Sequence, residues 1–283
     1  MKKDKRVKLN GLEQLLIDLK PRRCDADVYL KDEIDVTELS KYLEKKKKEG
    51  KSYTYFHAIL LAFAKTIYNR PKLNRYVKNR HVYEHSDVSI SFVAKIKFED
   101  SSEEMALIIP VEKDDTIDTI SKKIKDKVDA LRSHKFDVKG ANNAMDILGK
   151  LPNIIRVPIV ALAKFIDKFN ALPKFLKDDN IYFASAIVTD IGVFKIPAIY
   201  HNNTNLGTAS SITAIGEVED KEILENGKPV KKKVVSIGVN LDERIADGFY
   251  MIKAYKLLTY ILNNPKLLET KASEKISIPK KEM

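Results

Sequence analysis

The clearest pattern of apolar and polar positions lies near the end of the chain, in residues 234–265. Large apolar side chains occupy every second position of 234–241, and this period of two predicts a strand. Asp247 can then cap a helix, because its carboxylate can accept hydrogen bonds from the free amides of the first turn. Apolar residues recur every three or four positions after it until Pro265 ends the helix. The stretch therefore predicts a strand, a charged turn and a capped helix.

Similar periodicities divide the rest of the chain. They predict helices in residues 9–20, 35–49, 53–69 and 116–131, and strands in residues 25–34, 88–98, 105–111, 181–189 and 211–218, followed by an acidic turn at 219–227. Residues 137–175 are apolar and helical in pattern, with Lys164 and Lys168 beside the apolar positions. We expect these helices to cover the sheet, and we keep a helix that docks on a membrane surface or a partner as the alternative.

Composition excludes several classes of protein. Apolar residues make up 44% of the chain and charged residues 32%, as in a folded globular protein. The single cysteine and the lack of a secretory signal pattern favour a reducing, cytoplasmic setting. No apolar run is long enough to span a bilayer. His81 and His85, with nearby acids, have a spacing compatible with a metal, but no third ligand is apparent and we predict no metal site.

The net charge of +11 lies largely in the lysines at the end of the predicted helix 35–49 and in the last residues, and it is also compatible with an anionic partner. No basic element interleaved with aromatic residues accompanies the charge, so it does not indicate nucleic-acid binding. Attraction of a polyanionic small molecule explains the same charge.

The turn that follows the predicted strand at 234–241 has a specific sequence, Asp-Glu-Arg-Ile-Ala-Asp-Gly, at 242–248. It resembles the Asp-His-Arg-x-x-Asp-Gly motif of the catalytic domain of 2-oxo acid dehydrogenase acyltransferases, the E2 components, and the related motif of chloramphenicol acetyltransferases. Glu243 stands where these families have histidine. Three further stretches are similar to the same family: Glu33–Leu39, Pro71–Asn74, and the run Thr189-Asp190-Ile191-Gly192, which resembles the family's Ser-Asn-Leu-Gly.

The resemblance implies an α/β (α+β) fold like that of chloramphenicol acetyltransferase, a mixed sheet with helices packed on one face. It covers one domain, residues 1–268, and leaves 269–283 as a flexible basic tail. It also implies coenzyme A as a substrate, subunits that form homotrimers or larger trimer-based oligomers, and active sites at the interfaces between subunits. We expect no lipoyl domain in this chain.

The resemblance also implies roles for single residues. Glu243 would occupy the place of the general base, Thr189 would donate a hydrogen bond to the oxyanion, and Asp247 would organise the turn. Asp242, Arg244 and Gly248 would lie around the substrate. The family pairs the aspartate of its motif with an arginine near the amino end, for which Arg22 and Arg23 are the candidates.

Glu243 leaves two hypotheses open. A carboxylate is a weaker base than imidazole, but burial can raise the pKa of a glutamate enough for proton transfer near neutrality. The protein would then transfer an acyl group between coenzyme A and a thiol or amine acceptor. Alternatively, Glu243 is a structural residue paired with Arg244 or a lysine. The protein would then be a catalytically impaired paralogue, which binds coenzyme A or an acyl carrier or serves as an oligomeric scaffold.

Overall fold

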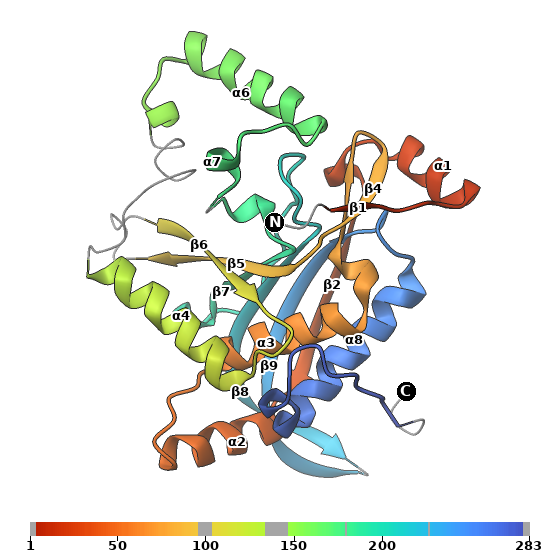
Figure 1. Ribbon diagram of the computed structural model, residues 1–283. Coiled ribbons are helices and arrows are strands. Elements are labelled where there is room, and N and C mark those ends of the chain that lie inside the picture. Colours follow the sequence, from red (N-terminus) through yellow and green to blue (C-terminus); the bar gives the residue numbers. More distant parts are fainter. Residues whose placement is uncertain (1–3, 96–103, 134–146, 179, 226, 280–283) are drawn as a thin grey trace.

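The computed structural model describes residues 4–95, 104–133, 147–178, 180–225 and 227–279. Its centre is a six-stranded mixed sheet with the order β2-β9-β8-β7-β5-β6 (Figure 1). The strands are β2 (Asp27–Asp35), β5 (Val88–Lys95), β6 (Glu104–Val111), β7 (Ala186–Asp190), β8 (Ser211–Glu225) and β9 (Lys228–Asp242). β7 pairs in parallel with both β5 and β8, and the remaining pairs are antiparallel. The predicted mixed sheet is confirmed.

Four helices pack on one face of this sheet and bury the main core: α2 (Thr37–Lys48), α3 (Tyr55–Asn69), α4 (Ile117–Arg132) and α8 (Gly248–Asn263). α3 is the central one, since its residues from His57 to Ile67 are all buried. A helix that is apolar on every side belongs in the interior of a domain. The prediction of helices on one face is confirmed.

The opposite face is covered by irregular chain between residues 191 and 210. Two glycines allow this chain to lie directly on the strands. A Cβ atom at Gly216 would lie 2.3 Å from the amide nitrogen of Ala198, and one at Gly238 would lie 2.5 Å from the carbonyl oxygen of Ile199. The Ala198 amide also donates to Ser236 Oγ at 2.8 Å. Larger residues at these two positions would push the covering segment away from the sheet.

A second, three-stranded sheet stands beside the first, with the order β1-β4-β3. It consists of β1 (Lys5–Arg6), β3 (Arg75–Lys78) and β4 (His81–Glu84). The helix α1 (Gly11–Leu19) and the 3-10 turn η1 (Arg23–Asp25) lie between β1 and β2 in the chain. Asn10 and Glu13 form a capping box at the start of α1, which fixes where this helix begins.

We expected the helices of residues 137–175 to cover the sheet. The structure differs, because α6 (Asn153–Lys168) and α7 (Lys174–Lys177) do not lie on it. α6 instead stands away from the sheet at the top of the view in Figure 1. The first part of the expected segment, residues 137–146, lies outside the described residues.

Two further expectations differ from the structure. β8 continues through Glu225 and pairs with β9 over its full length, so the acidic turn expected at 219–227 is wrong. Residues 270–278 belong to the flexible basic tail expected at 269–283, but they contact the body after the 3-10 turn η5 (Pro265–Glu269). Lys65 Nζ donates to the carbonyl oxygens of Thr270 and Lys271, and the Ala272 amide donates to Asp115 O at 2.7 Å.

Candidate functional site

The charged turn between β9 and α8 forms a buried corner. Asp242 is the last residue of β9 and is fully buried. Its carboxylate accepts hydrogen bonds from Arg244, with Nε 2.8 Å from Oδ1 and Nη2 2.7 Å from Oδ2. Such a bidentate pair is the strongest geometry for arginine and carboxylate. The Arg244 side chain is thereby fixed, and its Nη1 donates to the carbonyl oxygens of Lys20 and Pro21.

Arg23, from η1, is the second buried cation of the corner. Its Nε lies 3.6 Å from Asp242 Oδ2, and its Nη1 donates to Thr204 O at 2.8 Å. Burial lowers the pKa of Arg23, and the nearby Asp242 opposes that shift. Two guanidinium groups thus share one buried carboxylate. Arg23 was a candidate partner for Asp247, but the structure pairs it with Asp242, and it pairs Arg22 with Asp25.

Glu243 follows Asp242 and points toward α1. Its amide donates to Ala26 O at 2.9 Å, and its carboxylate forms an ion pair with Lys20, the residue after α1. The Glu243 side chain keeps 28% of its surface exposed, so solvent or a ligand can reach it. An ammonium group in contact stabilises the ionised form of a carboxylate. Of the two partners considered from the sequence, Arg244 or a lysine, the structure shows a lysine.

Asp247 and Gly248 start α8. Asp247 Oδ1 accepts the Tyr250 amide at 2.8 Å, as predicted for a helix cap, and this hydrogen bond holds the pKa of Asp247 below its usual value. Asp247 is exposed and lies outside the buried cluster of Asp242, Arg244 and Arg23.

Thr189 lies elsewhere on the sheet. It pairs with Ala214 of β8, which pairs in turn with Gly238 of β9. Thr189 therefore lies two strands across the sheet from Gly238, and Glu243 is five residues further along the chain, which separates Thr189 from Glu243 by about 20 Å at the usual strand spacing and rise per residue. One copy of the chain does not bring Thr189 and Glu243 together.

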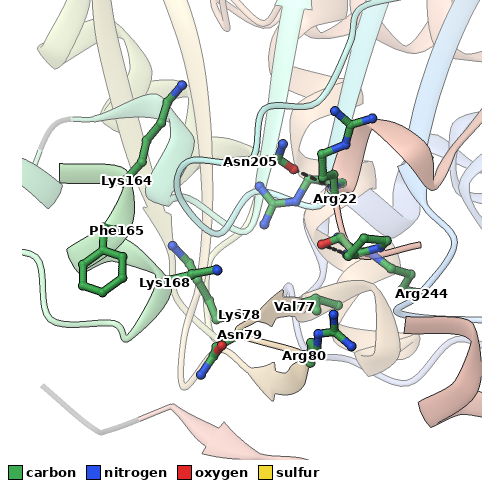
Figure 2. A pocket seen from close by; sticks show the side chains of 12 residues that line it. Arg22, Val77, Lys78, Asn79, Arg80, Lys164, Phe165, Lys168, Asn205 and Arg244 are labelled. Atoms are coloured by element: carbon green, nitrogen blue, oxygen red, sulfur yellow. Dashed lines mark hydrogen bonds between the residues drawn. The ribbon is translucent and has the colours of Figure 1, made fainter. Parts of the chain in front are cut away.

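A cationic cavity of about 410 Å³ opens beside the corner. Figure 2 shows its lining, which includes Arg244 from the corner, Arg22 near η1, Lys78 and Arg80 from the β3–β4 hairpin, and Lys164 and Lys168 from α6. Arg22 and Arg80 hold surface ion pairs with Asp25 and Asp18. Among the described residues, Lys164 and Lys168 contact no acidic side chain. The cavity therefore presents an excess of positive charge.

An apolar cavity of about 240 Å³ lies on the other side of the turn, between β2, β9 and α8. Leu241 and Gly248, the residues that flank the turn, both contribute to its wall, with Val28, Leu30 and Met251. The corner thus has a cationic cavity next to Arg244 and an apolar cavity next to Leu241.

The sequence analysis did not identify Lys20, Lys78, Lys164 or Lys168 as site residues. The run Lys20-Pro21-Arg22-Arg23 directly after the first helix was a signal for the cationic side, since three cations within four residues meet the turn there. The lysines of α6 gave no such signal, because only the fold places them beside the hairpin. Within the described parts of the chain, no group of three or more His, Cys, Asp and Glu side chains is placed to hold a metal ion.

Comparison with known proteins gives one family and several similar structures. The profile of the family "2-oxoacid dehydrogenases acyltransferase (catalytic domain)" matches residues 5–161. A search of curated proteins found no match.

Among solved structures, a probable dihydrolipoamide acetyltransferase from Listeria monocytogenes is similar, with a TM-score of 0.60 and 16% identity over 92% of this chain and 95% of that chain. The cubic core of the pyruvate dehydrogenase multienzyme complex is similar with a TM-score of 0.60 and 14% identity, over 91% of this chain and 88% of that chain. A chloramphenicol acetyltransferase is similar with a TM-score of 0.55 and 13% identity, over 92% of this chain and 100% of that chain. At these identities the likeness shows a shared fold.

Proposed function

Because the chain belongs to the 2-oxoacid dehydrogenase acyltransferase catalytic-domain family, we propose that it transfers an acyl group between coenzyme A and a thiol or amine acceptor. The observation that carries this proposal is the cationic cavity that opens directly beside the corner, with Arg244 in its wall. Coenzyme A carries a diphosphate and a further phosphate, and a concave cluster of arginine and lysine side chains is suited to such groups.

The apolar cavity supports an apolar acyl group. Its wall is almost entirely hydrocarbon, and it begins at Leu241 and Gly248, on either side of the turn that carries Glu243. A thioester with its nucleotide part in the cationic cavity and its acyl chain in the apolar cavity would cross the turn. The carbonyl carbon would then lie near Glu243.

Glu243 is the base in this proposal. The acceptor thiol or amine attacks the thioester carbonyl and gives its proton to the Glu243 carboxylate. The tetrahedral intermediate then collapses and the bond between the carbonyl carbon and the sulfur of coenzyme A breaks. The coenzyme A thiolate then takes the proton from Glu243. Lys20, which forms an ion pair with Glu243, adds a positive charge beside the turn, where the thiolate leaves. Because a carboxylate is the weaker base, we expect slower turnover than a histidine would give.

The position of Thr189 supports a site shared between subunits. Thr189 can donate to an oxyanion near Glu243 only if it comes from another copy of the chain, since about 20 Å separates the two residues within one copy. The surface around the corner has room for such a contact. α1 and β2 expose Leu12, Leu19 and Tyr29 there, at 79%, 71% and 45% of their surfaces. We propose a homotrimer, or a larger assembly of trimers, in which Thr189 and Glu243 of different subunits meet.

A second candidate function is binding without turnover. The pairing of Glu243 with Lys20 favours it, because an ion pair of this kind also serves a purely structural role. In that case the protein would hold coenzyme A or an acyl carrier in the same cavities. The two candidates differ in chemistry but share the binding site.

The experiment that separates them has two stages. A thermal-shift series with coenzyme A and acyl-coenzyme A esters of increasing chain length tests binding. A thiol-release assay on the esters that bind then tests transfer, with dihydrolipoamide and a simple amine as acceptors. We expect a higher melting temperature with these ligands and measurable thiol release. We also expect Glu243→Gln to lower the rate about 100-fold or more, as for loss of a general base.

Glu33→Gln is the matched control, because Glu33 also pairs with a lysine, Lys221, but lies well along β2 from the corner. It should leave thiol release unchanged. Stabilisation without thiol release would support the binding module and overturn the enzyme. An unchanged melting temperature with every ester would overturn both.

A further inference from the structure

The helix α6 exposes most of its apolar residues. Ile154 is 83% exposed, Leu162 58% and Phe165 59%. The other exposed apolar side chains of this region are Ile155, Val157, Ile159, Phe169 and Phe175. Asp167 is the one fully buried residue of α6. Large apolar side chains gathered on one exposed element indicate an interaction surface.

Most apolar side chains of α6 face away from the rest of the molecule, although Phe165 also borders the cationic cavity. The side chains that the body half covers, at 156, 160, 163 and 166, recur every three or four residues and form one stripe. At 100° per residue, the opposite side of the helix carries Ile154, Leu162 and Phe165. Figure 1 shows α6 at the edge of the molecule, away from the main sheet. A rotation of α6 that buried these residues would expose the half-covered stripe instead.

The orientation of α6 is fixed at its carboxyl end. Asp167 forms a buried ion pair with Lys78 of β3 and accepts the Gly207 amide at 2.9 Å. Asn170 Nδ2 lies 3.3 Å from the hydroxyl of Tyr76. Breaking a buried ion pair of this kind is strongly unfavourable, so the ion pair holds α6 with its apolar side outward.

The charges around this apolar side are mostly positive. Residues 147–177 contain six cations, Lys150, Arg156, Lys164, Lys168, Lys174 and Lys177, and one acid, Asp167. Asp167 is neutralised by Lys78 and turned inward. Asp178, at the end of α7, is the exposed acid next to this segment. The surface that α6 and α7 present to solvent is therefore apolar and mainly cationic. By contrast, the exposed apolar residues of α1 and β2 lie among acids such as Asp18 and Asp32.

We propose that α6 and α7 dock in the headgroup region of an anionic lipid bilayer, with α6 parallel to the membrane surface. Apolar residues on one side with flanking lysines are typical of helices that lie in this interface. Anionic lipids complement the cations, whereas a second copy of the chain would bring the same cations against them. In the described residues, no helix is long and apolar enough to cross a membrane. Lys164 and Lys168 also line the cationic cavity, whereas Ile154 and Leu162 do not, so docking is tested at the two apolar residues.

The chain contains no tryptophan, which allows a direct test. In the Leu162→Trp variant, a single fluorophore reports on the outward side of α6. Added vesicles of phosphatidylglycerol and phosphatidylcholine should shift its emission to shorter wavelength, and brominated lipid should quench it. Leu224→Trp is the control, because Leu224 is 74% exposed at the end of the β8–β9 ribbon, on another element. Its emission should not change.

Vesicle sedimentation tests the same surface without a fluorophore. The wild-type protein should sediment with anionic vesicles, far less with pure phosphatidylcholine, and less as salt is raised. Ile154→Glu with Leu162→Glu should weaken binding about tenfold or more, because two apolar contacts become charged. Ile223→Glu with Leu224→Glu adds the same charge elsewhere and should keep binding. Equal melting temperatures would show that both variants are folded.

Two results would overturn the proposal. One is failure of the wild-type protein to sediment with anionic vesicles at low salt. The other is an oligomer, seen by sedimentation velocity without lipid, that Ile154→Glu with Leu162→Glu converts to monomers. That second result would assign the apolar side of α6 to a contact between subunits.

Discussion

The corner at residues 242–248 and the helix α6 both depart from the usual distribution of polar and apolar residues, in opposite directions. The corner buries Arg23, Asp242 and Arg244, whereas α6 exposes Ile154 and Leu162. Buried charges and exposed apolar groups are the informative exceptions in a folded protein. In the corner, each buried charge has a partner within the chain. The apolar residues of α6 have none in the described structure, which directs attention to a partner outside it.

The largest effect should come from removing the shared carboxylate of the corner. Asp242→Ala leaves Arg23 and Arg244 buried without an acid, and this should lower the free energy of unfolding by about 3 to 5 kcal/mol. Urea denaturation measures the change. Asp25→Ala removes the exposed pair with Arg22 and should change the free energy of unfolding far less, because water screens exposed ion pairs. Equal effects from the two substitutions would contradict the view that the corner depends on internal pairing.

A smaller effect should follow from pH, through a buried histidine of the core helix α3. Burial lowers the pKa of His57 to about 4, and its Nδ1 lies 3.0 Å from Ser121 Oγ. The unfolded chain, with a histidine pKa near 6.5, binds the proton first as pH falls. The contribution of neutral His57 to the free energy of unfolding is therefore fully present above pH 6.5 and is lost as pH falls toward 4.

Between pH 7 and pH 4.5 this histidine should account for about 2 to 3 kcal/mol of lost stability. His57→Gln keeps a polar group beside Ser121 but does not titrate, so its unfolding free energy should fall by that much less over the same range. Burial also lowers the pKa of His85 and His201, and these histidines remain in both proteins. Identical pH dependence in the two proteins would show that His57 does not titrate as the structure implies.

The smallest effect should come from α6 itself. Leu162→Ala should change the free energy of unfolding by less than about 0.5 kcal/mol, because Leu162 is more than half exposed. Leu60→Ala, the same substitution in the fully buried α3, should cost about 2 to 5 kcal/mol. Thermal or urea unfolding compares them. A large loss for Leu162→Ala would mean that α6 is covered in solution, and the contrast with the corner would fail.

The sequence predicted the corner well because its signals are local. Alternation in 234–241, the cap at Asp247 and the motif between them lie within one short stretch; α8 forms where it was expected, and β9 contains the expected strand but begins earlier, at Lys228. The partners of the corner were not predicted, because Lys20 and Arg23 are more than 200 residues from it in sequence. Nothing local specifies such a pairing.

The same reasoning explains the errors elsewhere. The apolar pattern of α6 is typical of a helix that covers a sheet, but polar contacts at its carboxyl end, among them the buried pair of Lys78 with Asp167, hold it outward. The basic composition of the last residues suggested a free tail, but buried Lys65 on α3 binds the carbonyl oxygens of Thr270 and Lys271. Both of these errors come from long-range polar contacts that periodicity does not reveal.

The central claim is that Glu243 of one subunit and Thr189 of another form one catalytic site. Thr189→Val and Glu243→Gln should each reduce thiol release strongly when alone. Mixed oligomers of the two variants should regain about a quarter of the wild-type rate, because one interface in four then has both native residues. Subunit exchange can be verified by mass spectrometry. A mixture that exchanges subunits but is no more active than its two parents would contradict the claim.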